Sequence, residues 1–199
     1  MAMSAEVQLD LPQPTQLSRA HLLVRLLIAM VLGVLTRAVG WPGGVLYLVL
    51  PAFAAIRVSQ HGPVRYLGSD GPRLVRLLDW LLGFLAYMAL LTDDLPTADR
   101  MRVRCAFVPA GAPDVASVAL RIFTSIPAAL VTLVLSFVGG ILVLVQMVFV
   151  LVVQHYPRPF FEYQAGLLRV QARLLAYHAS LTDTYPSLSF HAPQLARAA

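Results

Sequence analysis

The feature that most constrains this chain is an apolar run from Val115 to Val153, in which Arg121 is the single charged residue. As one helix, a run of this length would measure about 58 Å, because each residue of an α-helix rises ~1.5 Å. The hydrocarbon core of a bilayer is only about 30 Å thick. The run is typical of a membrane protein, and it has to fold back to stay within one bilayer. Gly139-Gly140 permits a close reversal, so we predict a helical hairpin over residues 115–155.

A second pair of apolar segments lies earlier in the chain. Leu22–Val39 and Val45–Ile56 flank the turn sequence Gly40-Trp41-Pro42-Gly43-Gly44, which predicts a first hairpin over residues 20–58. The returning arms are short, since 141–154 would cover only about 21 Å as a helix. Two arrangements therefore stay open, hairpins that span the bilayer and hairpins that only wedge into it.

Composition agrees with a membrane location and narrows the chemistry. The chain is 58% hydrophobic and 13% charged, whereas an average soluble domain is roughly half apolar and about a quarter charged. Its 15 basic side chains are all arginines, which with 10 acidic ones give a net charge of +5. This excess alone does not indicate nucleic-acid binding. The single cysteine, Cys105, excludes an internal disulfide framework and a Cys-rich metal site, and we expect no cofactor.

The arginines also predict the orientation in the membrane. They gather before and after each predicted hairpin, at Arg19, Arg25, Arg57, Arg65, Arg73, Arg76, Arg100, Arg102, Arg104, Arg121, Arg158, Arg169 and Arg173. Cytoplasmic loops carry an excess of basic residues, so both termini and the middle segment are expected in the cytoplasm. Arg37 near the first turn is the exception. No cleaved signal peptide is expected at the N-terminus.

An internal repeat organises the sequence. Val24-Arg25-Leu26 matches Leu120-Arg121-Ile122, and Gly43-Gly44 matches Gly139-Gly140, both 96 positions later. Leu85-Ala86-Tyr87, Leu91-Thr92-Asp93 and Pro96 recur 90 positions later as Leu175-Ala176-Tyr177, Leu181-Thr182-Asp183 and Pro186. Polar matches in one order are hard to obtain by chance, so the sequence predicts a tandem duplication.

Each repeat is predicted to contain a short strand, a helical hairpin and an amphipathic helix lying along the membrane surface. The first repeat covers residues 1–96, with a strand at 5–11, the hairpin at 20–58 and the amphipathic helix at 72–92. The second covers residues 97–190, with a strand at 101–108, the hairpin at 115–155 and the amphipathic helix at 160–181, and residues 191–199 form a tail. The predicted fold class is thus an all-α integral membrane protein with four membrane helices, in which the two opening strands can pair as a small cytoplasmic β-ribbon. A third span per repeat, over residues 74–91 in the first, is the alternative.

Six charged residues are candidate contacts for lipids or partners: Arg25, Arg121, Arg158, Glu162, Arg169 and Arg173. Arg25 and Arg121 lie one turn inside a membrane arm, where we expect them to snorkel to the interface. The alternatives are an ion pair with Asp79 or Glu162, or a bound lipid phosphate. Thr92-Asp93 and Thr182-Asp183 are expected to bond to local backbone and end a helix.

One segment resembles a known family. The sequence Tyr-Pro-Arg-Pro-Phe-Phe-Glu-Tyr-Gln-Ala-Gly-Leu-Leu-Arg over 156–169, closed by Leu-Thr-Asp-Thr-Tyr-Pro over 181–186, resembles an uncharacterised prokaryotic integral membrane family, domain of unknown function 4389. The resemblance implies a multi-pass protein of the cytoplasmic (inner) membrane and the boundaries of the repeat unit, but no reaction, cofactor or substrate. The first repeat lacks the Phe-Phe-Glu-Tyr block, so it is a degenerate copy.

No catalytic motif stands out in the chain. The sequence lacks a Ser-His-Asp order, a phosphate-binding loop and a dinucleotide-binding glycine pattern, and the apolar segments lack buried carboxylates. We therefore do not expect an enzyme. The leading hypothesis is a non-catalytic membrane scaffold or accessory subunit, whose partners are anionic lipid headgroups and other membrane proteins or further copies of itself. The alternatives are a self-assembling, membrane-shaping hairpin protein and a small channel or lipid-binding protein.

Overall fold

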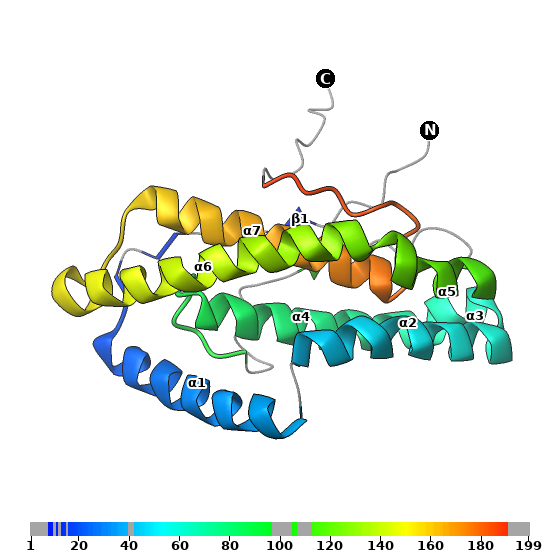
Figure 1. Cartoon of the computed structure of the whole chain (residues 1–199), viewed down its shortest axis with the longest axis horizontal. Helices are drawn as coiled ribbons and strands as arrows, with labels where there is room; N and C mark the ends of the chain where they lie inside the picture. Colours follow the sequence, from blue (N-terminus) through cyan, green and yellow to red (C-terminus); the bar gives the residue numbers. More distant parts are fainter. Residues whose placement is uncertain are drawn as a thin grey trace.

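A computed structural model describes residues 8–9, 11, 13–14, 16–39, 42–96, 105–106 and 113–190. It is helical, as predicted (Figure 1). The elements in chain order are β1 (Gln8–Leu9), α1 (Arg19–Val39), α2 (Pro42–His61), α3 (Pro63–Arg65), the π-helix η1 (Tyr66–Asp70), α4 (Gly71–Met88), β2 (Cys105–Ala106), α5 (Val115–Thr124), α6 (Ile126–Val153) and α7 (Arg158–His178).

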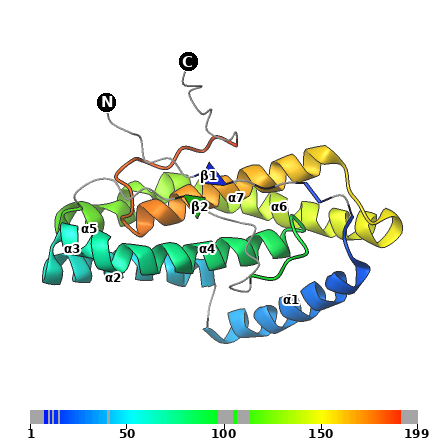
Figure 2. The same cartoon turned by 180° about the vertical axis from the view of Figure 1, so that it is seen from behind.

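Helix α7 is the centre of the fold. It packs against α6, α4, α2 and α5, and about half of its residues are buried, including Ala165, Leu168 and Ala172. One hydrophobic core joins α7 to α4 and the start of α1, and a second joins α2 and α4 around Tyr66 and Leu78. In Figures 1 and 2, α6 runs alongside α7, and α1 stands apart at the end of the molecule where α6 ends.

The predicted hairpin over residues 20–58 is wrong. Figures 1 and 2 show α2 running on in the same general direction as α1 instead of folding back on it. Helix α2 packs on α5, and α1 contacts α6. Each arm of the first apolar pair therefore contacts the second apolar run instead of returning along its own partner.

The reversal predicted at Gly139-Gly140, and with it the hairpin over residues 115–155, is also wrong. Helix α6 continues through both glycines, and the interruption falls at Ser125 between α5 and α6, two residues before Pro127. A glycine weakens a helix by only about 1 kcal/mol relative to alanine and does not break it. Gly139 instead permits close packing, because a Cβ there would lie 2.7 Å from Cδ2 of Leu167 on α7.

The two opening strands are reduced to a short contact. Within the described residues, β1 and β2 each hold two residues and pair antiparallel, with Gln8 opposite Ala106 and Leu9 opposite Cys105. The predicted pairing of the two opening strands is therefore present over two residues of each strand, and no longer β-ribbon occurs within the described residues. The rest of the predicted strands 5–11 and 101–108, and the tail 191–199, lie outside the described residues.

The predicted helices 72–92 and 160–181 correspond to α4 and α7, and the polar side of α7 is covered by protein. The C-terminal segment, residues 185–190, covers its polar side, where a Cβ on Gly166 would lie 2.7 Å from the Phe190 side chain. Arg169 donates to the carbonyl of Phe190 at 3.2 Å, and Arg173 donates to the carbonyl of Ser189 at 2.6 Å. The polar stripe binds the chain's own backbone, a partner that helical periodicity does not show.

One helix in the described part of the chain, α6, is both long and apolar enough to cross a membrane. Most of its large apolar side chains are exposed, with Phe137 at 72% and Leu144 at 64%. Apolar residues of α1, α2 and α5 are exposed as well, among them Leu23, Phe53 and Phe123.

Candidate functional site

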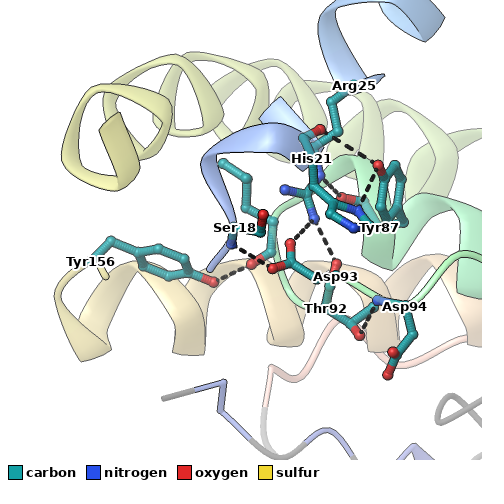
Figure 3. A network of polar contacts seen from close by, with 9 residues as sticks. Ser18, His21, Arg25, Tyr87, Thr92, Asp93, Asp94 and Tyr156 are labelled. Atoms are coloured by element: carbon teal, nitrogen blue, oxygen red, sulfur yellow. Dashed lines mark hydrogen bonds and ion pairs between the residues drawn. The ribbon is translucent and has the colours of Figure 1, made fainter. Parts of the chain in front are cut away.

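The side chain of Arg25 on α1 is completely buried and forms the centre of the first arginine site (Figure 3), which comprises Arg25, Tyr87, Thr92 and Asp93. Its Nε donates to the carbonyl of Tyr87 at 2.7 Å, and one Nη donates to the carbonyl of Thr92 at 2.6 Å. The same Nη lies 2.9 Å from Oδ1 of Asp93. The guanidinium also lies over the ring of Tyr87, 4.3 Å from its centroid. The site thus ties the first turns of α1 to the end of α4.

Ser18, which directly precedes α1, and His21 in α1 complete this site. The backbone N–H of Ser18 donates to Oδ2 of Asp93 at 2.7 Å, so both carboxylate oxygens have donors. Nδ1 of His21 lies 3.2 Å from the hydroxyl of Tyr87, and the two rings meet edge to face (Figure 3). The carboxylate itself is 25% exposed.

A left-handed turn at the end of α4 presents the backbone acceptors. Leu90 has φ +61°, and the N–H groups of Leu90 and Leu91 bond back to the carbonyls of Tyr87 and Ala86. This is the hydrogen-bond pattern of a Schellman helix end. Carbonyls at a helix C-terminus carry partial negative charge, so a guanidinium is stabilising there. Arg25 therefore acts as a cationic cap for α4 that comes from another helix.

The second arginine site, Arg121, Tyr177, Thr182 and Asp183, repeats this arrangement at the end of α7. One Nη of Arg121 donates to the carbonyls of Tyr177 at 3.2 Å and Thr182 at 2.7 Å, while the other pairs with Oδ1 of Asp183. The guanidinium lies 4.9 Å from the centroid of the Tyr177 ring. The side chain of Arg121 is 5% exposed, and that of Asp183 is 47% exposed.

The turn that builds the second site is also the same. Ser180 has φ +53°, and the N–H groups of Ser180 and Leu181 bond to the carbonyls of Tyr177 and Ala176. The threonine of each site accepts a hydrogen bond from the N–H two residues later, Asp94 in the first and Thr184 in the second. The local role expected for both threonines is confirmed.

The snorkelling interpretation of Arg25 and Arg121 is wrong, because both guanidinium groups are buried and paired. Their partners are Asp93 and Asp183, and not Asp79 or Glu162. The sequence carried a usable signal, since Arg and Leu-Thr-Asp recur in the same order in both halves. The expectation that each aspartate bonds only to local backbone leaves out its ion pair with a distant arginine.

Two tyrosines connect the halves reciprocally. Tyr66 in η1 donates its hydroxyl to the carbonyl of Ala179, beside the turn of the second site. Tyr156 donates to the carbonyl of Leu90, in the turn of the first site, at 2.7 Å. Burial raises the pKa of both phenols, which keeps them protonated as donors. Each half therefore supports the arginine site of the other.

The π-helix that carries Tyr66 is fixed by a two-point ion pair. Nε and one Nη of Arg57 each lie 2.9 Å from an oxygen of Asp70. The hydrogen bonds from Arg57 hold the pKa of the nearly buried Asp70 below its usual range. This pair connects the end of α2 to the start of α4.

A cluster of buried polar side chains lies at the interruption between α5 and α6. Nδ1 of His178 donates to the carbonyl of Leu174 at 2.8 Å, which leaves Nε2 to accept from the hydroxyl of Ser125 at 3.0 Å. Tyr47 donates to the carbonyl of Ile122 at 2.6 Å, and its ring lies 4.4 Å from that of His178. Burial lowers the pKa of His178 and favours the neutral imidazole that this arrangement uses.

The remaining candidate contacts are separate from the arginine sites. Arg158 and Glu162 form an exposed pair one turn apart on α7, at 2.8 Å. Arg169 and Arg173 bind the C-terminal segment described above. The structure therefore does not bring the six predicted contact residues into one surface.

The chemistry of both arginine sites is that of helix capping and ion pairing. In the described ranges of the chain, no group of three His, Cys, Asp or Glu side chains is placed to hold a metal ion. In the first site both oxygens of Asp93 accept hydrogen bonds, while the second Nη of Arg25 is buried without a partner among the described residues; the second site keeps an exposed carboxylate at Asp183.

Comparison with known proteins matches one part of the chain. Residues 116–189 match the family model described as domain of unknown function (DUF4389). This stretch runs from α5 through α7 to the C-terminal segment and contains the whole second arginine site. No curated protein and no solved structure matches the chain.

Proposed function

We propose that this chain is a non-catalytic, multi-pass integral membrane protein, built from two tandem copies of one unit, that serves as a scaffold or accessory subunit of a membrane assembly. The observation that carries the proposal is the pair of equivalent arginine sites, in which buried charge fixes helix ends.

Exposed apolar surface supports the membrane part of the proposal. Monomeric soluble proteins rarely expose contiguous apolar patches larger than a few hundred Å². Here large apolar side chains are exposed along the whole of α6 and on α1, α2 and α5. Lipid is the solvent that suits these faces, so we assign all four helices to the membrane.

The contact pattern supports two copies. Arg25 and Arg121 each reach the tyrosine carbonyl, the threonine carbonyl and the aspartate that end the amphipathic helix of their own half. The membrane arms are exchanged between the halves, since α2 packs on α5 and α1 contacts α6. On this proposal the family match covers the second copy, and the first is a degenerate copy that the family model does not reach.

The chemistry of the sites supports a structural role. A catalytic acid, base or nucleophile needs a reacting group within reach, whereas in the first arginine site both oxygens of Asp93 already accept hydrogen bonds, from Ser18 and Arg25. Charged groups placed in this way fix one arrangement of the helices. A rigid unit with large apolar faces suits attachment to other membrane helices.

Arginines flank the apolar segments, and we place the chain in the inner membrane of a prokaryote. The predicted cytoplasmic N- and C-termini require apolar arms that return to their starting side, whereas α6 runs on without a reversal, so this orientation is not part of the proposal. Anionic headgroups would then face exposed charges such as Arg158, which is 78% exposed.

The test is purification of the tagged chain from its native membrane in two mild detergents, followed by native mass measurement and identification of every retained chain. The control is the same tagged chain made in a host that lacks its native partners. We expect foreign membrane subunits in one fixed ratio in both detergents and none in the control. A pure homo-oligomer would contradict the accessory role and favour a self-assembling or channel protein.

A further inference from the structure

A pocket of about 400 Å³ opens beside the second arginine site. Its polar and aromatic lining comes from Asp114, Ser117, Arg121, Thr124, Tyr177 and Asp183. Arg121 pairs with Oδ1 of Asp183, but no donor in the described part of the chain reaches the other oxygen of that carboxylate. The pocket therefore contains an exposed carboxylate oxygen next to an aromatic ring.

In the first arginine site, protein groups fill the space that corresponds to this pocket. Asp114 and Ser117 stand 96 positions after Ser18 and His21, which are the residues that close the first site. There, the Ser18 N–H donates to Oδ2 of Asp93 and the His21 imidazole packs on Tyr87. In the second site the N–H of Asp114 turns instead to the hydroxyl of Ser117, at 3.2 Å. The smaller serine leaves the space of an imidazole empty, and the hydroxyl of Tyr177 pairs with Thr124 at 3.1 Å.

The second site lacks a hydrogen-bond donor to the second oxygen of Asp183, and this lack defines the chemistry of an occupant. It has to donate an N–H group to Asp183 and fit a space of imidazole size beside Tyr177, whose ring already carries the guanidinium of Arg121. The charged groups that line the pocket are the carboxylates of Asp114 and Asp183 and the guanidinium of Arg121, so the lining is net negative. A cationic N–H donor forms a strong, charge-assisted hydrogen bond with such a carboxylate.

We propose that this pocket binds a small primary ammonium group, such as the ethanolamine headgroup of a phospholipid or a free alkylamine. This inference goes beyond the structural role proposed above, and it differs from the anionic headgroups expected from the arginines. Leu120, at 58% exposed, and Phe123, at 69%, lie on the same helix and offer an apolar surface for acyl chains. A lipid source therefore fits the surroundings of the pocket.

Titration calorimetry on the full chain in detergent tests the proposal with soluble short-chain lipids. Dihexanoyl phosphatidylethanolamine has N–H donors, whereas dihexanoyl phosphatidylcholine has a quaternary ammonium without any. We expect saturable binding of one ethanolamine lipid per chain and at least tenfold weaker binding of the choline lipid. Competition by free ethanolamine would support a soluble amine as ligand, and its failure would support the lipid.

Matched variants assign the binding to this pocket. Ser117→His restores the residue type that closes the first site, so it should abolish binding. It also removes the Ser117 side of the capping box of α5, so Ser117→Ala, which loses the same cap without adding bulk, is the stability control and should keep binding. His21→Ser is the mirror change and should leave binding at one per chain, because Asp93 keeps the donor from Ser18. Equal binding of the two lipids, or unchanged binding in Ser117→His, would overturn the proposal.

Discussion

Arg25 and Asp93 are 68 positions apart in the sequence, yet their side chains meet at 2.9 Å with the guanidinium fully buried. Arg121 and Asp183 form the corresponding pair, with a carboxylate that is about half exposed. The two pairs share their chemistry and differ in burial. Substitutions at equivalent positions therefore measure how burial changes the strength of one interaction.

Removing the aspartate should harm the first site more than the second. Loss of one partner from a buried ion pair costs about 3–5 kcal/mol, because the other charge stays buried and unpaired. Asp183 is 47% exposed against 25% for Asp93, and Arg121 lines an open pocket, so solvent already screens the second pair and reaches Arg121 once Asp183 is removed. We expect a loss of this size for Asp93→Ala and a clearly smaller one for Asp183→Ala, measured by chemical denaturation in detergent. Glu162→Ala, which breaks an exposed pair on α7, is the control and should change the stability by less than about 1 kcal/mol. Equal losses at both aspartates would refute the burial argument.

Ser180→Gly should stabilise the protein. Ser180 has φ +53°, and its buried hydroxyl has no hydrogen-bond partner among the described residues. Glycine adopts a left-handed conformation without the Cβ penalty of about 1–2 kcal/mol. Ser180→Ala separates the two effects, since it removes the hydroxyl but keeps the Cβ. The unfolding midpoint should rise most for glycine, and a lower midpoint for glycine than for alanine would contradict the strain argument.

The helical character of the fold and the positions of α4 and α7 follow from sequence pattern, but the pairing of the helices does not. Hydropathy locates the apolar helices, and the recurrence of Arg and Leu-Thr-Asp marks the residues of both sites. Gly139-Gly140 was misleading, because a glycine pair suits a turn and a close helix contact equally well. Only the position of Leu167 and Gln164 on α7 decides between them. The contacts of α2 with α5 and of α1 with α6 depend on tertiary packing, which periodicity does not encode.

His178 should make the stability depend on pH in the mildly acidic range. Burial lowers its pKa in the folded protein, so the unfolded chain takes up a proton near the ordinary histidine value of about 6.5 while the folded protein does not. The contribution is therefore present above pH ~6.5 and is lost as the pH falls below that value. Unfolding midpoints measured at several pH values should show this fall. His178→Gln should flatten the profile, whereas His155→Gln, at an exposed position, should not; an unchanged profile in His178→Gln would contradict this assignment.

Gln146→Met tests a buried amide on α6. Gln146 is fully buried, and neither polar atom of its side chain has a hydrogen-bond partner in the part of the chain that the structure describes. A buried polar group without a partner costs about 1–3 kcal/mol, so an apolar side chain of similar shape should raise the unfolding midpoint. Gln164→Met is the matched control and should lower it, because Gln164 donates to the carbonyl of Gly139 at 2.7 Å. Destabilisation by Gln146→Met would indicate a bound partner for that amide.

Placement in the bilayer is the central claim, and spin-label accessibility on α6 tests it most directly. In a Cys105→Ser background, labels at Phe137→Cys and Leu144→Cys report the exposed face, and labels at Thr132→Cys and Val150→Cys report the buried face. In lipid vesicles we predict high collision rates with oxygen and low rates with a water-soluble nickel chelate at the exposed positions, and low rates with both at the buried ones. High nickel accessibility at Phe137→Cys and Leu144→Cys would place this face in water and contradict the account.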